Sequence, residues 1–207
     1  MKKNLPKRTE QVYKVYITFF TDRTTWENTL GSPIATEDFN GVTPFVLGAG
    51  SNAAGQIDIS LANLFGAANE IGDISEFWLI DGTTGFLGVA SAVGAENITV
   101  DLPLAVFGFG ADFSTTHSGG GLTLEIDSIL AEFSTVLPGG ADGTGFLGVI
   151  STNAFSSVRL FDTSQNETFG MDNVSFSTVA TIPEPGTLAI LGLGLVGLGL
   201  ARGRRAA

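Results

Sequence analysis

Between residues 34 and 177, short apolar runs alternate with turn-forming residues. Gly, Asn, Asp and Pro end most runs before they reach the length of a typical helix, so the runs are typical of β-strands. Many short strands separated by turn signals predict an all-β fold, namely a β-sandwich or jelly-roll-like domain. The candidate strands are residues 34–39, 57–61, 77–80, 86–90, 98–102, 106–113, 122–126, 129–135, 146–150, 157–161 and 171–177.

One short segment near the N-terminal end has the pattern of a helix. Residues 24–30 carry Thr24 and Glu27 at the spacing of a capping box, and Gly31 follows directly. A glycine just past the last helical residue suits the left-handed conformation that ends many helices. We therefore expect one short helix around Trp26 in an otherwise β-rich domain.

The hexapeptide TGFLGV occurs twice, at residues 84–89 and again at residues 144–149. Both copies follow an Asp-Gly pair, Asp81-Gly82 and Asp142-Gly143, which is typical of a tight turn. Two copies are too few for a repeat architecture. We interpret them as equivalent turn-then-strand segments in two packed sheets.

The composition is that of one folded domain without disulfides. The chain has 207 residues, of which 43% are hydrophobic, and it contains 28 glycines and no cysteine. This length and apolar content allow a sizeable core. The lack of cysteine excludes disulfides, cysteine nucleophiles and cysteine-ligated metal sites. The fold must therefore depend on its core, or on a metal held by other ligands.

Acidic residues dominate the middle of the chain. From Thr24 to Ile182 there are 18 acidic side chains and one basic side chain, Arg159, so this part carries a charge of about −17. Such a surface repels phosphate backbones and anionic lipid headgroups, which excludes nucleic acid as an expected partner. Divalent cations and neutral sugars are compatible partners. Simple solubility of a secreted domain explains the same charge.

The C-terminal end has three parts in a fixed order. Pro183, Glu184 and Pro185 come first, an uncharged run over residues 186–201 follows, and Arg202, Arg204 and Arg205 come last. As a helix the run reaches about 24 Å, slightly less than the ~30 Å of a bilayer core. The arginines favour the cytoplasmic side. The pattern predicts a single transmembrane helix over residues 187–201, with the body outside the cell.

These three parts together resemble the PEP-CTERM sorting signal. The resemblance implies an exported protein of a Gram-negative, exopolysaccharide-making bacterium, recognised by an exosortase-type enzyme. It further implies cleavage near the Pro-Glu-Pro triplet and loss of the helix. The protein would then pass from a membrane-anchored form in the cell envelope to the cell surface or the extracellular matrix. The sorting residues would be Pro183, Glu184, Pro185, Arg202, Arg204 and Arg205.

The chain thus divides into three expected segments: an N-terminal segment over residues 1–16, a β-domain over residues 17–180, and the sorting tail over residues 181–207. The N-terminal segment is basic, but the apolar run of a secretory signal does not follow it. This departs from the PEP-CTERM pattern. We expect that the signal region is lost or that the start of the chain is misassigned.

A second, looser resemblance concerns a metal. Glu37-Asp38-Phe39-Asn40-Gly41 and Asp172-Asn173-Val174 are similar to segments of carbohydrate-binding β-sandwich modules. In those modules an early acid and an acid of the last strand lie side by side and hold a structural calcium. The resemblance implies calcium ligands among Glu37, Asp38, Asp172 and Asn173, and hard cations do prefer such oxygen ligands. The alternative is that Asp172 and Asn173 are turn residues at the start of a strand.

The residues give no support for an enzyme. His117 is the only histidine, and no G-x-S-x-G nucleophile motif accompanies it. A glycosidase would need one particular pair of carboxylates, and the many acids select no pair. The sequence therefore predicts a non-catalytic protein.

Two function classes stay open. The first is a non-catalytic surface or matrix protein, and the second is a carbohydrate-binding module of the exopolysaccharide matrix. A sugar binder needs an aromatic platform, and the tryptophans and tyrosines are Trp26, Trp78, Tyr13 and Tyr16. Trp26 falls in the expected helix and Trp78 in a core-like strand, which favours the first class.

Overall fold

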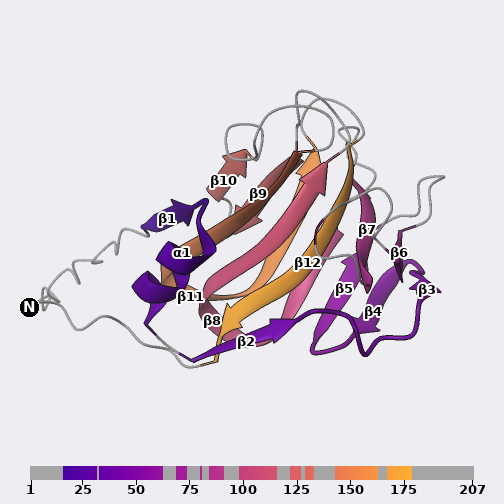
Figure 1. Ribbon diagram of the computed structural model, residues 1–207, viewed down its shortest axis with the longest axis horizontal. Helices are drawn as coiled ribbons and strands as arrows, with labels where there is room; N and C mark the ends of the chain where they lie inside the picture. The colour runs from indigo at the N-terminus through magenta and orange to yellow at the C-terminus, as the bar shows by residue number, and fades with distance from the viewer. Residues whose placement is uncertain are drawn as a thin grey trace, which may run out of the picture.

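A computed structural model describes residues 16–31, 33–62, 69–73, 80, 84–90, 98–115, 122–126, 129–132, 143–162 and 167–178. These ranges contain one helix and twelve strands, which confirms a mostly β fold with one short helix (Figure 1). The helix is α1 (Arg23–Leu30). The strands are β1 (Ile17–Phe20), β2 (Ile34–Glu37), β3 (Phe45–Val46), β4 (Gly50–Ala54), β5 (Ile57–Leu61), β6 (Glu70–Asp73), β7 (Thr84–Ala90), β8 (Ile98–Thr115), β9 (Leu122–Ile126), β10 (Ile129–Glu132), β11 (Gly143–Asp162) and β12 (Glu167–Ser177).

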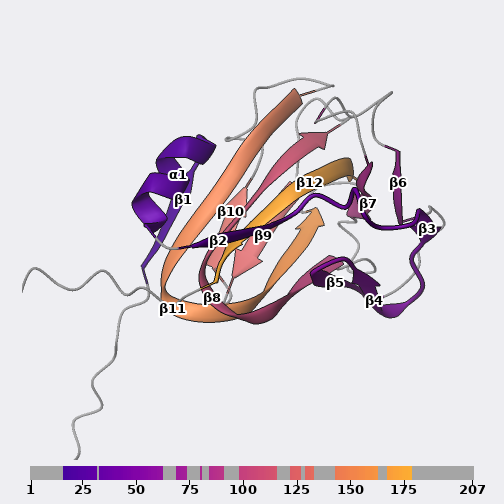
Figure 2. The ribbon, with the colours of Figure 1, turned by 60° about the horizontal axis from the view of Figure 1, so that its bottom comes forward.

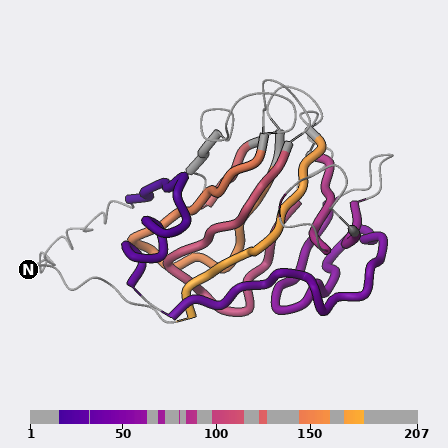
Figure 3. Tube along the Cα trace, in the orientation of Figure 1, coloured from indigo at the N-terminus to yellow at the C-terminus, as the bar shows by residue number. Residues whose placement is uncertain are grey.

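Within the described ranges the strands join into one open sheet. Its main path runs β10-β9-β11-β8-β12-β7-β6-β3, and every pairing is antiparallel. Three branches leave this path: β1 lies beside β11, β2 lies beside β12, and β5 links the β4–β5 hairpin to β8. Figure 3 shows that the chain runs along the edge of β12 in β2 and then continues toward β3 and β4.

The two longest strands, β8 and β11, each cross two parts of the sheet. Residues 98–101 of β8 pair with β5, and residues 109–115 pair with β12. The register between β8 and β11 shifts on either side of Phe155. Figure 2 shows both strands curving strongly along their length. The sequence predicted two strands in each case, because Pro103 and polar residues interrupt the apolar pattern where the strands change register.

One apolar core lies between the two parts of the sheet. Its buried side chains come from the part around β5 and β9 and from the part around β12 and β7 alike. The fully buried members include Ile59, Val100 and Leu160 from the first part, and Phe109, Phe113 and Met171 from the second. Burying each such side chain stabilises the folded state by about 1.5–3 kcal/mol, relative to leaving it exposed to water. The long strands therefore fold the sheet around a shared interior.

The two TGFLGV copies do not lie in two packed sheets, and this interpretation was wrong. They form β7 and the beginning of β11, which belong to one sheet with β12 and β8 between them. Equivalent side chains of the two copies also point to opposite faces of the sheet. Phe86 of the first copy is in the core, whereas in the second copy Leu147 is in the core and Phe146 packs under α1. Pairing decides this, because Phe86 lies opposite Met171 and Leu147 lies opposite Ala111.

Helix α1 covers the outer face of β11. Its N-cap is Asp22, whose side chain accepts hydrogen bonds from the Thr25 amide and hydroxyl, so the predicted capping box at Thr24 was wrong. The prediction for Gly31 is confirmed, since it ends the helix with a φ of 62°. Trp26 is fully buried and donates from Nε1 to the Val149 carbonyl over 3.1 Å.

Several predictions fall outside the described residues. The N-terminal segment up to residue 15, the predicted transmembrane helix over residues 187–201 and the side chains of Tyr13, Trp78 and His117 all lie there. In the part of the chain that is described, no helix has the length and apolar character needed to cross a membrane.

Candidate functional site

The six residues predicted for sorting, Pro183, Glu184, Pro185, Arg202, Arg204 and Arg205, lie outside the described residues. A candidate site among the described residues must therefore lie in the β-domain. Two polar groups of the body include the predicted calcium ligands. The first surrounds Glu37 at the end of β2, and the second surrounds Asp112 and Asn173 under α1.

Glu37 is a buried carboxylate, with 6% of its surface exposed. Its Oε1 accepts a hydrogen bond from the Phe39 amide over 2.8 Å, and its Oε2 accepts one from the Gln56 amide over 2.6 Å. Both oxygens therefore bind backbone donors of the protein. Asp38, the next predicted ligand, is exposed and its Oδ1 accepts from the Asn40 amide over 3.1 Å. These contacts tie β2 to the turn of the β4–β5 hairpin.

Asp172 and Asn173 lie at an irregularity in β12. Asp172 is fully buried and lies directly opposite Asp112 of β8, and the register shifts between Asp172 and Ser175. Asn173 has a φ of 50°, a conformation that asparagine tolerates better than most residues. Its Nδ2 donates to Asp112 Oδ2 over 3.1 Å. The extra residue at this bulge therefore places the Asn173 amide against Asp112.

The structure does not bring the four predicted calcium ligands together. Glu37 lies opposite Val174, which belongs to the core face, whereas Asp172 lies opposite Asp112, next to Phe146 on the α1 face. Directly opposite residues point to the same face of a sheet, so Glu37 and Asp172 point to opposite faces. Among the described residues no group of three or more acidic or histidine side chains could hold a metal ion. The residues do not fit the calcium site that the resemblance implied.

Arg23 organises the second polar group, and the sequence did not single it out. Its Nη2 lies 3.0 Å from Asp112 Oδ2 and donates to the Asn173 carbonyl over 3.0 Å. Its Nη1 donates to Ser175 Oγ over 2.8 Å, and the guanidinium carbon lies 4.6 Å from the centre of the Phe146 ring. One signal was present in the sequence. An arginine in the first turn opposes the helix dipole, which suggests that tertiary contacts hold it there.

These contacts join four elements of the fold. Arg23 comes from α1, Asp112 from β8, Asn173 and Ser175 from β12, and the Ser175 hydroxyl also lies 3.0 Å from the Thr36 hydroxyl of β2. Arg23 and Asp112 are each about a quarter exposed, so their ion pair is partly screened by water. The group is a connected polar patch at the edge of α1.

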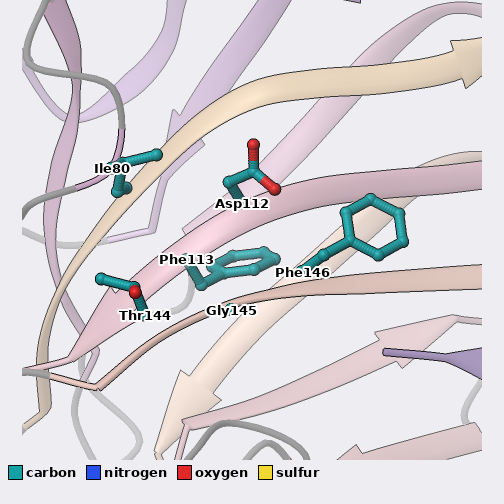
Figure 4. A pocket seen from close by; sticks show the side chains of 6 residues that line it. All are labelled: Ile80, Asp112, Phe113, Thr144, Gly145 and Phe146. Atoms are coloured by element: carbon teal, nitrogen blue, oxygen red, sulfur yellow. The ribbon is translucent and has the colours of Figure 1, made fainter. Parts of the chain in front are cut away.

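A cavity of about 210 Å³ opens beside this patch. It is lined by Ile80, Asp112, Phe113, Thr144, Gly145 and Phe146. Figure 4 shows the Asp112 carboxylate standing above β8, with Ile80 to one side and the Phe146 ring to the other. Arg23 and Asn173 both contact Oδ2 of Asp112, and within the described ranges Oδ1 accepts no hydrogen bond. The cavity therefore offers a fixed acceptor next to apolar walls.

The described aromatic residues do not form a sugar-stacking platform. Trp26 is fully buried, as its place in the helix predicted, and Phe146 is 7% exposed with Trp26 and Arg23 against it. Tyr16 is 59% exposed at the start of β1. Any ligand at the cavity would therefore be recognised through hydrogen bonds more than through stacking.

Comparison with known proteins identifies the tail and not the body. Residues 181–205 match the family model described as the PEP-CTERM protein-sorting motif. The match contains the Pro-Glu-Pro triplet and all three terminal arginines, so the predicted sorting signal is confirmed. No curated protein matches the chain.

Proposed function

Because the chain carries a PEP-CTERM protein-sorting motif, a signal that targets exported proteins to exosortase, we propose that it is a non-catalytic protein of the cell surface or extracellular matrix. The β-domain is the part displayed, and the tail delivers it. The motif match is the observation that carries this proposal. The acidic body and its shared apolar core support it, because both suit a soluble domain that holds together without disulfides.

In this proposal the tail acts in steps. Residues 187–201 form a helix that holds the exported chain in the membrane, with Arg202, Arg204 and Arg205 on the cytoplasmic side. Exosortase then cleaves near Pro183, Glu184 and Pro185 and releases the β-domain. The proposed body is a sandwich-like domain, which the shared apolar core and the long strands β8 and β11 support.

Mass spectrometry of the C-terminus tests this route. The chain is expressed in a host that has exosortase and in the same host without it. We expect the released protein to end near residue 185 only when exosortase is present. Replacing the triplet residue Glu184→Ala should cause the uncleaved form to accumulate in the membrane fraction, whereas Glu27→Ala, on the exposed side of α1, should not. An intact C-terminus on released material would contradict the proposal.

A second candidate function is binding of a matrix sugar. The specific observation is the cavity of about 210 Å³ beside Asp112, whose Oδ1 accepts no hydrogen bond from the described residues. Sugar hydroxyls donate hydrogen bonds to such acceptors. Co-sedimentation of the full-length chain with an insoluble neutral polysaccharide tests this candidate, and a carboxylated polysaccharide serves as the control.

A further inference from the structure

We propose that the cavity beside Asp112 is a binding site for a single neutral sugar ring. This inference rests on the second candidate function and gives it a location and a ligand class. Four features of the described residues support it: the hydrogen-bonding groups of the cavity, its charge, its size, and the rigidity of the Asp112 carboxylate.

The first feature is that the hydrogen-bonding groups at the cavity have spare capacity. Asp112 and Thr144 line the cavity, and within the described ranges neither Asp112 Oδ1 nor the Thr144 hydroxyl makes a hydrogen bond. Ser114 lies directly opposite Thr144 in the next strand. Its hydroxyl is buried, at 2% exposure, and has no hydrogen-bond partner among the described residues. Buried hydroxyls nearly always have a partner, so Ser114 is an unsatisfied polar group in the strand pair that lines the cavity.

Charge selects a neutral ligand. The carboxylate of Asp112, together with a body that carries about −17 between residues 24 and 182, disfavours anions. A cation is disfavoured as well, because the Arg23 guanidinium already lies 3.0 Å from Asp112 Oδ2. A neutral molecule with several hydroxyl donors can bind Oδ1 without displacing that ion pair. A sugar has this chemistry.

The size of the cavity limits the ligand to one ring. Pockets for drug-sized ligands usually have volumes of about 300–1,000 Å³, and this cavity has about 210 Å³. Its apolar walls are Ile80, Phe113 and Phe146, whose carbon atoms can contact the C–H groups of a ring. The face of Phe146 is occupied by Arg23, so the ring does not stack there.

The acceptor is held in place before any ligand arrives. Arg23 and Asn173 both fix Oδ2 of Asp112, and Arg23 is itself bound to Ser175 and to the Asn173 carbonyl. A carboxylate fixed in this way loses little side-chain entropy on binding. The polar patch under α1 thus holds Asp112, a residue of the cavity lining, through its Oδ2.

Titration of the full-length chain with glucose, galactose, mannose and glucuronate tests the proposal, in a detergent without a sugar headgroup. We expect one or more of the neutral sugars to bind, and glucuronate to bind at least about tenfold more weakly because of charge repulsion. Thr144→Val keeps the shape of the side chain and removes the hydroxyl, and Asp112→Asn removes the charge. Each should weaken the neutral sugar by about tenfold.

Asp58→Asn is the matched control. Asp58 is an exposed acid of β5 that lies away from the cavity residues, so its replacement should leave the Kd unchanged. Thr144→Val touches none of the Arg23 contacts, which keeps the test valid if Asp112→Asn unfolds. Absence of neutral sugar binding in the titration, or equal Kd values for the wild type and Thr144→Val, would overturn the proposal.

The outcomes separate this site from the functions on which it rests. If the chain still co-sediments with neutral polysaccharide in the Thr144→Val and Asp112→Asn variants, sugar binding is correct and the location is wrong. If the wild type does not co-sediment at all, the second candidate function is itself wrong. Processing by exosortase is measured in cells and depends on neither result.

Discussion

The Glu37 carboxylate occupies the space that a side chain on Gly55 would need. Gly55 lies in the turn between β4 and β5 with a φ of 71°, and the next amide, Gln56, donates to Glu37 Oε2. The acid and the glycine therefore form one structural unit that attaches the β4–β5 hairpin to β2. The resemblance to carbohydrate-binding modules had implied that Glu37 is a calcium ligand.

Gly55→Ala should destabilise the protein by more than about 2 kcal/mol, because it adds left-handed strain to an overlap with a buried carboxylate. Two other glycines separate these effects. Gly31 also has a left-handed backbone, but no atom lies near the position of an added Cβ, so Gly31→Ala should cost about 1–2 kcal/mol from strain alone. Gly41 has neither a left-handed backbone nor an atom near an added Cβ, so Gly41→Ala should change the free energy of unfolding by no more than about 0.5 kcal/mol. Urea unfolding of the three variants measures the order, and a Gly55→Ala protein as stable as Gly31→Ala would contradict the overlap.

Glu37→Gln should lower the free energy of unfolding by about 1–3 kcal/mol. Glutamine can accept from one backbone amide, and its own NH₂ group then faces the other donor, Phe39 or Gln56. Asp38→Asn is the control. The side chain at this position is exposed, and its amide oxygen can still accept the hydrogen bond from the Asn40 backbone amide. If the two variants have equal stability, the Glu37 contacts do not hold the hairpin.

Calcium should leave the melting temperature unchanged. Glu37 and Asp172 point to opposite faces of the sheet, and both Glu37 oxygens already bind backbone amides. A ligand that binds only the folded state at a hundredfold excess over Kd would add about 2.7 kcal/mol. Differential scanning calorimetry in millimolar calcium and in chelator checks this. A clear rise that Asp172→Ala abolishes would restore the calcium hypothesis.

The cap of α1 should make stability depend on pH in the acid range. The hydrogen bonds from the Thr25 hydroxyl and amide lower the pKa of Asp22 below its usual value of 3.8. The cap thus contributes its full stabilisation above pH 3.8, and this is lost as the pH falls through the lower pKa of the folded state. Asp22→Ala should reduce the melting temperature at pH 7, and the difference should shrink below pH 3.8. A difference that is constant over this range would argue against the carboxylate as the cap.

The same replacement should destabilise the protein by different amounts in the two TGFLGV copies. Leu147 is fully buried, so Leu147→Asn should cost more than about 4 kcal/mol through lost burial and an unsatisfied amide. Leu87 is half-buried on the other side of its strand, and Leu87→Asn should cost about 1 kcal/mol. Circular dichroism melting of the two variants checks this, and equal losses would show that the copies have the same orientation.

The strands were predictable where their apolar pattern is local. Residues 57–61 and 122–126 form β5 and β9 with the predicted bounds. The joining of residues 98–102 and 106–113 into β8 was not, because Pro103 cannot donate a ladder hydrogen bond and indicates a break. Only the tertiary pairing, with a register shift in the partner strand β11, lets the chain continue through it.

The candidate site was predictable only in fragments. Asp172 and Asn173 were selected, but the acid that Asn173 contacts is Asp112, which lies 61 residues away. Arg23 reaches Asn173 and Ser175 over about 150 residues of chain. Contacts at such separation depend on strand order and on a bulge, and neither leaves a periodic signal in the sequence.

The continuity of β8 and β11 has a consequence for how the body responds to force and heat. Each strand contributes ladder hydrogen bonds to both parts of the sheet, so opening one part disturbs strands on which the other part also depends. We expect the domain to melt in one cooperative transition, without a stable half-open form. Under load the body would then yield as a single unit, because the shared strands provide no hinge between its two sides.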